Sequence, residues 1–264
     1  MWNPRGQRVV VTGASSGIGA ATATEFARRG AVVGLVARRR EQLGDVLATC
    51  RQTSPDSQMF VADLSEIDAI DGLVTTITAT LGQIDVLVNN AGVPKRRKTS
   101  AMTVADAESV MRMNYLSPVA LSIAVLPALR QRDAGHIVNI SSMGAHMVSF
   151  GVGAYSASKA ALEYFTEAMY VELVGTGVHA HVVVPGTTLS EFSTPKDGND
   201  PPFQSDPDMA ATPEIVAAAI IACLSDDRFI TYATERDEAT ATSRNADPNA
   251  FLATMRDRLA GLGR

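Results

Sequence analysis

The stretch "VVVTGASSGIG", residues 9–19, joins a run of valines to a glycine-rich turn and then to an amphipathic segment. A short valine run indicates a buried strand, and residues 17–29, ended by Gly30, indicate a helix. Glycines in such a turn let a pyrophosphate approach the free N–H groups at the start of the helix. The glycine spacing is G-x-x-x-G-x-G rather than G-x-G-x-x-G, but in both patterns the glycines allow the tight turn and the close approach of the phosphates. We therefore predict a dinucleotide-binding turn formed by Gly13, Ser15, Ser16, Gly17, Ile18 and Gly19.

The rest of the chain repeats this alternation of apolar runs and amphipathic segments. Further strands are predicted within residues 31–37, 57–64, 84–92, 135–142, 178–186 and 228–233, with helices between them. One long helical region covers residues 103–132, with Pro118 as its expected interruption. Regular alternation of this kind predicts an α/β fold, a doubly wound parallel sheet of about seven strands with helices on both faces, of the Rossmann type.

No linker or repeat divides the chain, so we predict a single domain over residues 1–264. Residues 187–211 are rich in Pro, Gly, Asp and Ser, and we call them the substrate loop, because a loop this long inside a domain is usually functional or mobile. Residues 233–264 form a polar tail that ends in a helix expected at about 248–262.

The composition excludes several classes of protein. With 23 Lys and Arg against 28 Asp and Glu, the net charge is −5, which does not favour nucleic-acid binding. Two cysteines are too few for a disulfide framework, and no ligand spacing indicates a metal site. We find no signal peptide and no segment expected to span a membrane. The expectation is a cytoplasmic protein that acts on a small molecule.

The end of the second predicted strand, "LVARRR", bears on the choice of cofactor. NAD-dependent enzymes usually place a carboxylate there to hold the ribose hydroxyls, whereas this chain has Ala37 followed by Arg38 and Arg39. A guanidinium pairs with a 2′-phosphate, which a carboxylate would repel. We therefore predict that NADP(H) is preferred over NAD(H).

Tyr155 and Lys159 stand four residues apart on a predicted helix, among small residues. Side chains at this spacing share one helix face, so the Lys159 ammonium can lie near the Tyr155 ring. A nearby cation favours the phenolate and lowers the pKa of the phenol, which suits acid–base chemistry. Ser142 ends a strand at the carboxyl edge of the sheet, where open α/β folds bind ligands.

These residues occur in the order and spacing of the short-chain dehydrogenases/reductases, which the chain resembles over residues 7–232. The resemblance rests on Thr12 with the glycine turn, "NNAG" at 89–92, Asn114, Ser142, and Tyr155-x-x-x-Lys159. It implies that Tyr155 is the acid/base, that Lys159 holds the nicotinamide ribose and lowers the pKa of Tyr155, and that Ser142 binds the substrate oxygen. Asn114 would position a water in a proton relay. The further cofactor contacts that it implies are Asp63 at the adenine, Leu64, Asn90, Ala91, Gly92, Pro185, Gly186, Thr188 and Ser190.

Together these observations predict an NADP(H)-dependent oxidoreductase that moves hydride between the nicotinamide and a carbonyl or secondary alcohol. The substrate is expected to be weakly polar, because Met143, Met147, Val148, Phe150 and Phe192 flank the site. The resemblance also implies a homodimer or homotetramer. The tail lacks the Gly-rich segment found after the last strand in many members of the family.

Two alternatives remain. A reductase of 3-oxoacyl thioesters could use the basic residues 95–98 as a rim for an acidic carrier, although such charge runs are more often solvated loops. A non-catalytic NADPH-sensing regulator would be expected to lack Tyr155 or Lys159, and both are present. His146 could line the pocket, but a lone histidine is more often a packing residue.

Overall fold

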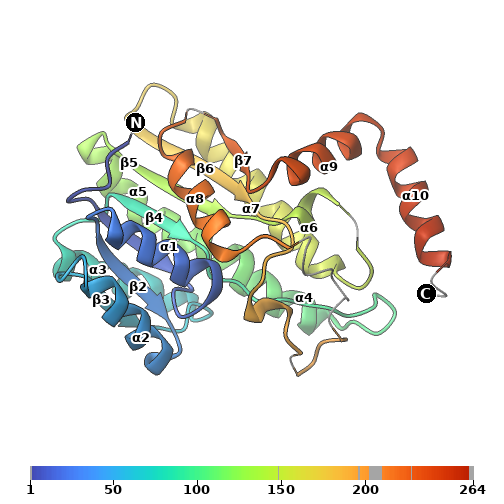
Figure 1. Ribbon diagram of the computed structural model, residues 1–264, viewed down its shortest axis with the longest axis horizontal. Coiled ribbons are helices and arrows are strands. Elements are labelled where there is room, and N and C mark those ends of the chain that lie inside the picture. The colour runs from blue at the N-terminus through green and yellow to red at the C-terminus, as the bar shows by residue number, and fades with distance from the viewer. Residues whose placement is uncertain (1, 148, 196, 202–209, 227, 262–264) are drawn as a thin grey trace.

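Seven parallel strands form the centre of the computed structural model, which describes residues 2–147, 149–195, 197–201, 210–226 and 228–261. The strand order is β3-β2-β1-β4-β5-β6-β7 (Figure 1). The bounds are β1 Arg8–Thr12, β2 Val32–Ala37, β3 Gln58–Val61, β4 Val86–Asn89, β5 Gly135–Ile140, β6 Val178–Val184 and β7 Ile230–Tyr232. The predicted doubly wound sheet is confirmed, with its order reversing between β1 and β4.

Helices cover both faces of this sheet. On one face lie α1 (Gly17–Arg28), α2 (Arg40–Arg51) and α8 (Pro213–Cys223), and on the other α3 (Ile70–Leu81), α5 (Ser117–Arg132) and α7 (Gly153–Glu172). Val9 and Val11 of β1 belong to the first core and Val10 to the second, all nearly without exposure. Strands covered on both faces must be apolar almost throughout, which is why the valine runs indicated the fold.

The long helical region differs from the prediction at its interruption. It divides into α4 (Val104–Met111), a π-helical turn η2 (Arg112–Leu116) and α5, and Pro118 lies in the first turn of α5. The backbone stays helical up to this proline, since the Ser117 N–H donates to the Arg112 carbonyl oxygen, five residues back. The break is therefore the π turn, and such turns occur frequently at functional sites.

In the described part of the chain, one helical stretch, Val104–Arg132, is long and apolar enough to cross a membrane by length and composition. Its residues Leu121, Val125 and Leu129 are buried in the core beneath the sheet. This packing is that of a core helix.

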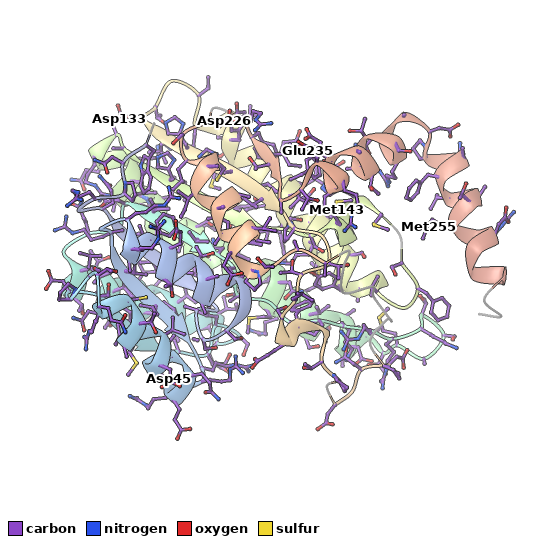
Figure 2. All side chains as sticks on the ribbon, in the orientation of Figure 1. Asp45, Asp133, Met143, Asp226, Glu235 and Met255 are labelled. Carbon is purple, nitrogen blue, oxygen red and sulfur yellow. The ribbon has the colours of Figure 1, made fainter. Side chains whose placement is uncertain are left out.

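The tail contains more helix than the sequence predicts. After β7 the chain forms α9 (Glu235–Ala246) and α10 (Pro248–Gly261), and only α10 was expected. Thr234 caps α9 by accepting a hydrogen bond from the Asp237 N–H, but the helix carries too few apolar residues to show a periodic stripe. α10 projects away from the sheet (Figure 1), and Figure 2 labels Met255 on it.

Three histidines on β5 and β6 pack together away from the glycine turn. His136 Nδ1 lies 3.2 Å from His181 Nε2, its ring stacks on His179, and Trp2 contacts it edge-on at 5.8 Å between centroids. Burial, with a smaller contribution from the neighbouring His181 and His179, lowers the pKa of His136 to about 3. All three are strand residues.

This burial predicts a pH dependence of stability. Between about pH 6.5 and 3, the unfolded chain binds a proton at His136 that the folded chain does not. Stability therefore falls as the pH falls below 6.5, by about 2 kcal/mol for this group between pH 7 and 5. Urea unfolding of a His136→Asn variant at these two pH values should show that much less loss than the parent protein. A His179→Asn variant, changed at an exposed position, should lose as much stability between pH 7 and 5 as the parent protein. If His136→Asn also loses as much as the parent protein, His136 is not the group responsible.

Candidate active site

Two turns meet at the carboxyl edge of the sheet, where the strand order reverses. The Thr12 hydroxyl at the end of β1 accepts hydrogen bonds from the N–H groups of Asn90 and Ala91 after β4, both at 3.0 Å. Asn90 returns a bond from its Nδ2 to the Thr12 carbonyl at 2.9 Å. The "TG" and "NNAG" motifs therefore hold one another at the position where such folds bind ligands.

The glycine turn has backbone geometry that only glycine adopts without strain. Gly13 has a φ of +67° and Gly17 a φ of +54°, both in the left-handed region. A Cβ on Gly19 would lie 2.3 Å from the Gly13 carbonyl oxygen and 2.5 Å from Asn90 Nδ2. α1 begins after Ser16 with no side-chain cap and no acidic residue in its first turn. This start of α1 suits a phosphate, because its N–H groups carry partial positive charge and its first turn holds no carboxylate that would repel an anion.

Two arginines flank the turn. The Arg39 guanidinium donates to the Ser16 hydroxyl at 2.6 Å and to the Ser15 hydroxyl at 3.1 Å, and it forms a 2.7 Å ion pair with Glu191 of the substrate loop. Arg38 Nη1 lies 3.3 Å from Asp63 Oδ2. Both arginines are exposed at the pocket, and each is paired with a carboxylate at the end of the site where α1 begins.

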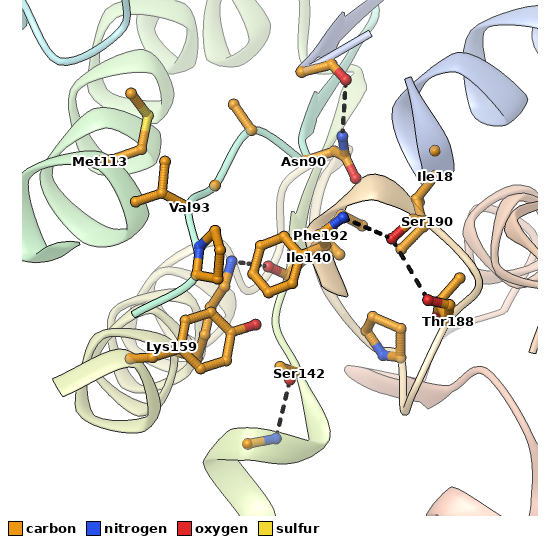
Figure 3. A pocket seen from close by; sticks show the side chains of 18 of the residues that line it. Ile18, Asn90, Val93, Met113, Ile140, Ser142, Lys159, Thr188, Ser190 and Phe192 are labelled. Carbon is orange, nitrogen blue, oxygen red and sulfur yellow. Dashed lines mark hydrogen bonds between the residues drawn. The ribbon is translucent and has the colours of Figure 1, made fainter. Parts of the chain in front are cut away.

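One cavity of about 550 Å³ extends from the glycine turn to Ser142 and Tyr155. Figure 3 shows Asn90 and Ile18 on one side of it and Ser142, Lys159 and Phe192 on the other. The predicted site residues that line it are Gly13, Ser15, Ser16, Gly17, Ile18, Arg38, Arg39, Leu64, Asn90, Ala91, Gly92, Ser142, Tyr155, Lys159, Pro185, Gly186, Thr188 and Ser190.

Three predicted site residues do not line this cavity. Gly19 faces Gly13 and Asn90 instead, and Asn114 is fully buried behind the cavity wall. Asp63 was expected at the adenine, but its Oδ1 accepts bonds from the backbone N–H and hydroxyl of Ser65, and its Oδ2 faces Arg38. The carboxylate is thus turned along the chain, and its neighbours Ala62 and Leu64 line the cavity in its place.

Lys159 and Tyr155 project from the first turns of α7 into the cavity. The Lys159 ammonium donates to the Ile140 carbonyl oxygen at 2.8 Å, and burial lowers its pKa to about 8. Burial raises the pKa of Tyr155 to about 12, and a hydrogen bond with Ser142 offsets part of that rise. In the chain without cofactor, burial is therefore the larger influence on the Tyr155 pKa, and the lowering expected from Lys159 stays a prediction.

Asn114 occupies the π turn η2 and ties three segments together. Its Oδ1 accepts from the Val93 N–H at 2.8 Å, and its Nδ2 donates to the Val93 carbonyl oxygen at 3.0 Å and to the Ser158 hydroxyl at 3.1 Å. The π turn directs this amide inward, which links the segment after β4 to the helix that carries Tyr155 and Lys159.

The basic residues 95–98 are largely engaged within the chain. Lys95 and Arg97 both pair with Asp106, at 2.5 and 3.4 Å, and Lys98 lies over the Phe150 ring. Arg96 is 6% exposed and donates to the carbonyl oxygens of three substrate-loop residues, which are Phe192, Thr194 and Asp200. These residues are thus neither the solvated loop nor the open cationic rim that the sequence suggested. They fasten the substrate loop to the segment after β4.

The described part of the substrate loop closes one side of the cavity. Its base is paired by hydrogen bonds between Leu189 and Ala211 and between Ala211 and Thr187. Phe192 lies with its ring 5.6 Å from that of Tyr155, and Met143 and Met147 also line the cavity, as expected. Phe150 does not, because it packs under Lys98, and Val148 falls outside the described residues.

Sequence reasoning missed several lining residues, among them Val93, Met113, Val152, Arg96 and Glu191. Arg96 belongs to the basic residues 95–98, but nothing in the sequence distinguishes it from the other three. Glu191 carries no motif, and its pairing with Arg39 depends on how the substrate loop folds back.

Comparison with known proteins gives consistent results. The family model described as short chain dehydrogenase matches residues 7–200. An uncharacterized oxidoreductase of Mycobacterium tuberculosis is 38% identical over 205 residues, which cover 72% of this chain and 60% of that protein. A fatty acyl-CoA reductase of Acinetobacter baylyi is 40% identical over 174 residues, which cover 65% of this chain and 59% of that protein. The chain thus spans about 60% of the length of these curated relatives.

Solved structures also resemble this one. A short-chain dehydrogenase from Streptomyces avermitilis has a TM-score of 0.81 at 28% identity, covering 97% of this chain and 98% of that one. A short-chain dehydrogenase from Sphingobium yanoikuyae in complex with NADPH has a TM-score of 0.77 at 28% identity, covering 91% and 94%. Because the family model covers most of the chain and its motif residues meet at one site, the chain belongs to the short-chain dehydrogenase/reductase family.

Proposed function

We propose that this protein is an NADP(H)-dependent oxidoreductase that interconverts a carbonyl and a secondary alcohol. The observation that carries the proposal is a single cavity with two chemically different ends. One end offers Arg38, Arg39 and the start of α1 to phosphates, and the other offers Ser142, Tyr155 and Lys159 to a reacting oxygen. The distance between these ends is spanned by one continuous space of about 550 Å³, which suits a dinucleotide followed by a small substrate.

The residues fit such a cofactor in their chemistry. At the phosphate end, glycines with positive φ leave the backbone open. Beside Lys159, a Cβ on Gly92 would lie 3.2 Å from Asn114 Oδ1 and 3.6 Å from Lys159 Nζ. When bound, the nicotinamide supplies or accepts the hydride. Lys159 would hold the adjoining ribose hydroxyls, while Thr188 and Ser190 would hold the carboxamide.

The chain's own part in the reaction is proton transfer and orientation. Ser142 and Tyr155 would hydrogen-bond the substrate oxygen, and Tyr155 would donate its proton as the oxygen gains negative charge. Burial raises the pKa of Tyr155 to about 12, so the phenol keeps its proton at neutral pH, and the Lys159 cation would make that proton easier to transfer. Asn114, fixed between Val93 and Ser158, would position a water for the relay that returns the proton.

Cofactor choice is tested by Arg38→Asp. We expect the parent protein to bind NADPH more tightly than NADH, and the variant to bind NADPH at least 100-fold more weakly, because a cation beside the 2′-phosphate is replaced by an anion. NADH binding should change by less than about threefold, since NADH has no charge at this position. Nicotinamide fluorescence during titration measures both affinities.

Arg40→Asp is the matched control for this measurement. Arg40 is exposed, begins α2 and does not line the cavity, so the same change of charge should have little effect. If the parent protein prefers NADH, then Arg38 and Arg39 after β2 do not bind a 2′-phosphate as proposed. Binding of neither nucleotide would overturn the proposed function.

The substrate is proposed to be weakly polar, because Val93, Met113, Met143, Met147 and Phe192 surround the reacting end. The name of one relative, a fatty acyl-CoA reductase, favours a carbonyl compound that carries a fatty chain as one candidate. The idea of a 3-oxoacyl carrier contact at residues 95–98 loses support, since Lys95, Arg96 and Arg97 are engaged internally. A non-catalytic NADPH sensor remains the alternative that Tyr155→Phe distinguishes.

We also propose a cytoplasmic homodimer or homotetramer. α7 exposes Tyr164 and Val171 at 75% and 64%, and α5 exposes Ile123 at 60%. Large apolar side chains exposed together on neighbouring helices favour burial against another copy of the chain.

A further inference from the structure

Glu163 forms a small hydrogen-bonded network beside the proposed site without lining the cavity. It lies on α7 one turn after Lys159, with a side chain that is 16% exposed. Its Oε1 accepts a hydrogen bond from the Ser141 hydroxyl and one from His146 Nε2, the latter at 3.0 Å. A carboxylate oxygen can only accept, so the proton of the His146 ring must be on Nε2.

The two donors stand on either side of Ser142. Ser141 immediately precedes it, and His146 ends α6 (Met143–His146), the single helical turn that begins after it. Within this turn the Ser142 hydroxyl accepts from the Gly144 N–H at 3.0 Å, and the Met143 N–H donates to the Pro185 carbonyl oxygen. One turn of helix is not stable by itself, so its position depends on contacts of this kind.

We propose that Glu163 is a positioning residue that holds Ser142 in place relative to Tyr155 and Lys159 by binding both ends of the 141–146 segment. Because Glu163 stands on the same helix as Tyr155 and Lys159, its two hydrogen bonds fix Ser142 against the frame that carries those two side chains. The catalytic consequence rests on the proposed function. A displacement of about 1 Å at a reacting group can lower a rate about 100-fold, so a contact outside the cavity can matter to the chemistry.

Two further contacts support this role. The His146 ring packs edge-on against Tyr232 of β7, with centroids 5.5 Å apart, which restricts its orientation toward Glu163. The negative charge of Glu163 also raises the pKa of Lys159 against the lowering by burial. Glu163 thus acts on the site both by geometry and by charge.

The two effects can be separated because both hydrogen bonds end on the same oxygen. Glu163→Gln removes the charge but retains an Oε1 that can accept both hydrogen bonds. Glu163→Leu removes the charge and the two hydrogen bonds. Glu167→Leu is the matched control, one turn further along α7 and exposed. If Glu163→Leu fails to fold, the double variant Ser141→Ala/His146→Phe removes the same bonds from their other ends.

The first measurement is amide hydrogen exchange of residues 142–147 in the protein without cofactor. We expect Glu163→Leu to raise exchange there at least tenfold, while Glu163→Gln and Glu167→Leu leave it within about threefold. Unchanged exchange in both Glu163→Leu and the double variant would overturn the proposal. This measurement needs neither nucleotide nor substrate, so a failure to bind NADPH would count against the proposed function alone.

The second measurement is steady-state reduction, with NADPH, of a panel made of an aliphatic aldehyde, a cyclic ketone and a 3-oxoacyl thioester. Glu163→Leu should lower kcat about 10- to 100-fold with an unchanged Kd for NADPH, and Glu163→Gln should recover most of that loss. An equal loss of kcat in Glu163→Gln and Glu163→Leu would show that the charge rather than the hydrogen bonds matters, which would overturn the positioning role.

Discussion

Replacing Tyr155 by Phe should lower kcat for carbonyl reduction by about 10²–10⁴, because it removes the hydroxyl that donates the proton. Burial raises the pKa of this phenol to about 12, so at neutral pH the parent protein presents a protonated donor to the substrate oxygen. Ser142 can still hydrogen-bond that oxygen, but no other described residue at the reacting end places a phenol there. The measurement is NADPH consumption, followed by its absorbance, with a substrate that the parent protein reduces.

Tyr170→Phe is the control, since Tyr170 stands on the same helix with 42% exposure and does not line the cavity. It should retain full activity, and both variants should bind NADPH as the parent does. Retention of more than a tenth of the activity in Tyr155→Phe would contradict the assigned role. A cellular phenotype that survives Tyr155→Phe while NADPH binding is intact would favour the sensor over the enzyme.

The fold could be predicted from sequence because its decisive signals are local. Buried parallel strands require uninterrupted apolar runs, and Val9 to Val11 provide one. α9 was missed because a polar helix capped by Thr234 has no apolar stripe to reveal it. The π turn at Arg112–Leu116 was missed because it depends on where Asn114 finds its partners, Val93 and Ser158, which are distant in sequence.

The site likewise contains residues that the sequence predicts and contacts that it does not. Motif residues follow directly after strands β1, β4 and β5, so the topology alone brings them to one edge of the sheet. The contacts of Arg96 and of Glu191 depend on how the substrate loop folds back, which no periodicity encodes. The i, i+4 argument considered the charge of Lys159 and not the burial of the phenol, which raises the pKa of Tyr155 in the chain without cofactor.

Two glycine-to-alanine substitutions should have opposite effects on stability. In Gly19→Ala the new Cβ would lie 2.3 Å from the Gly13 carbonyl oxygen, which is backbone and cannot turn aside. We expect a loss of about 1–3 kcal/mol of stability. NADPH should also bind at least tenfold more weakly, because relieving the clash moves the turn proposed to hold the phosphates.

Gly44→Ala provides the matched comparison, in the interior of α2, where nothing lies within 4 Å of the added Cβ. Alanine there should stabilise the protein by about 0.5–1 kcal/mol, because glycine loses more backbone entropy on folding. Urea unfolding measures both changes, and titration with NADPH should show normal affinity for Gly44→Ala. Equal stability of the two variants would mean that the Gly13–Gly19 contact is not tight in solution. Both substitutions remove the backbone entropy of a glycine, which favours the folded state. A loss of stability in Gly19→Ala beside a gain in Gly44→Ala would therefore be due to the clash of the new Cβ.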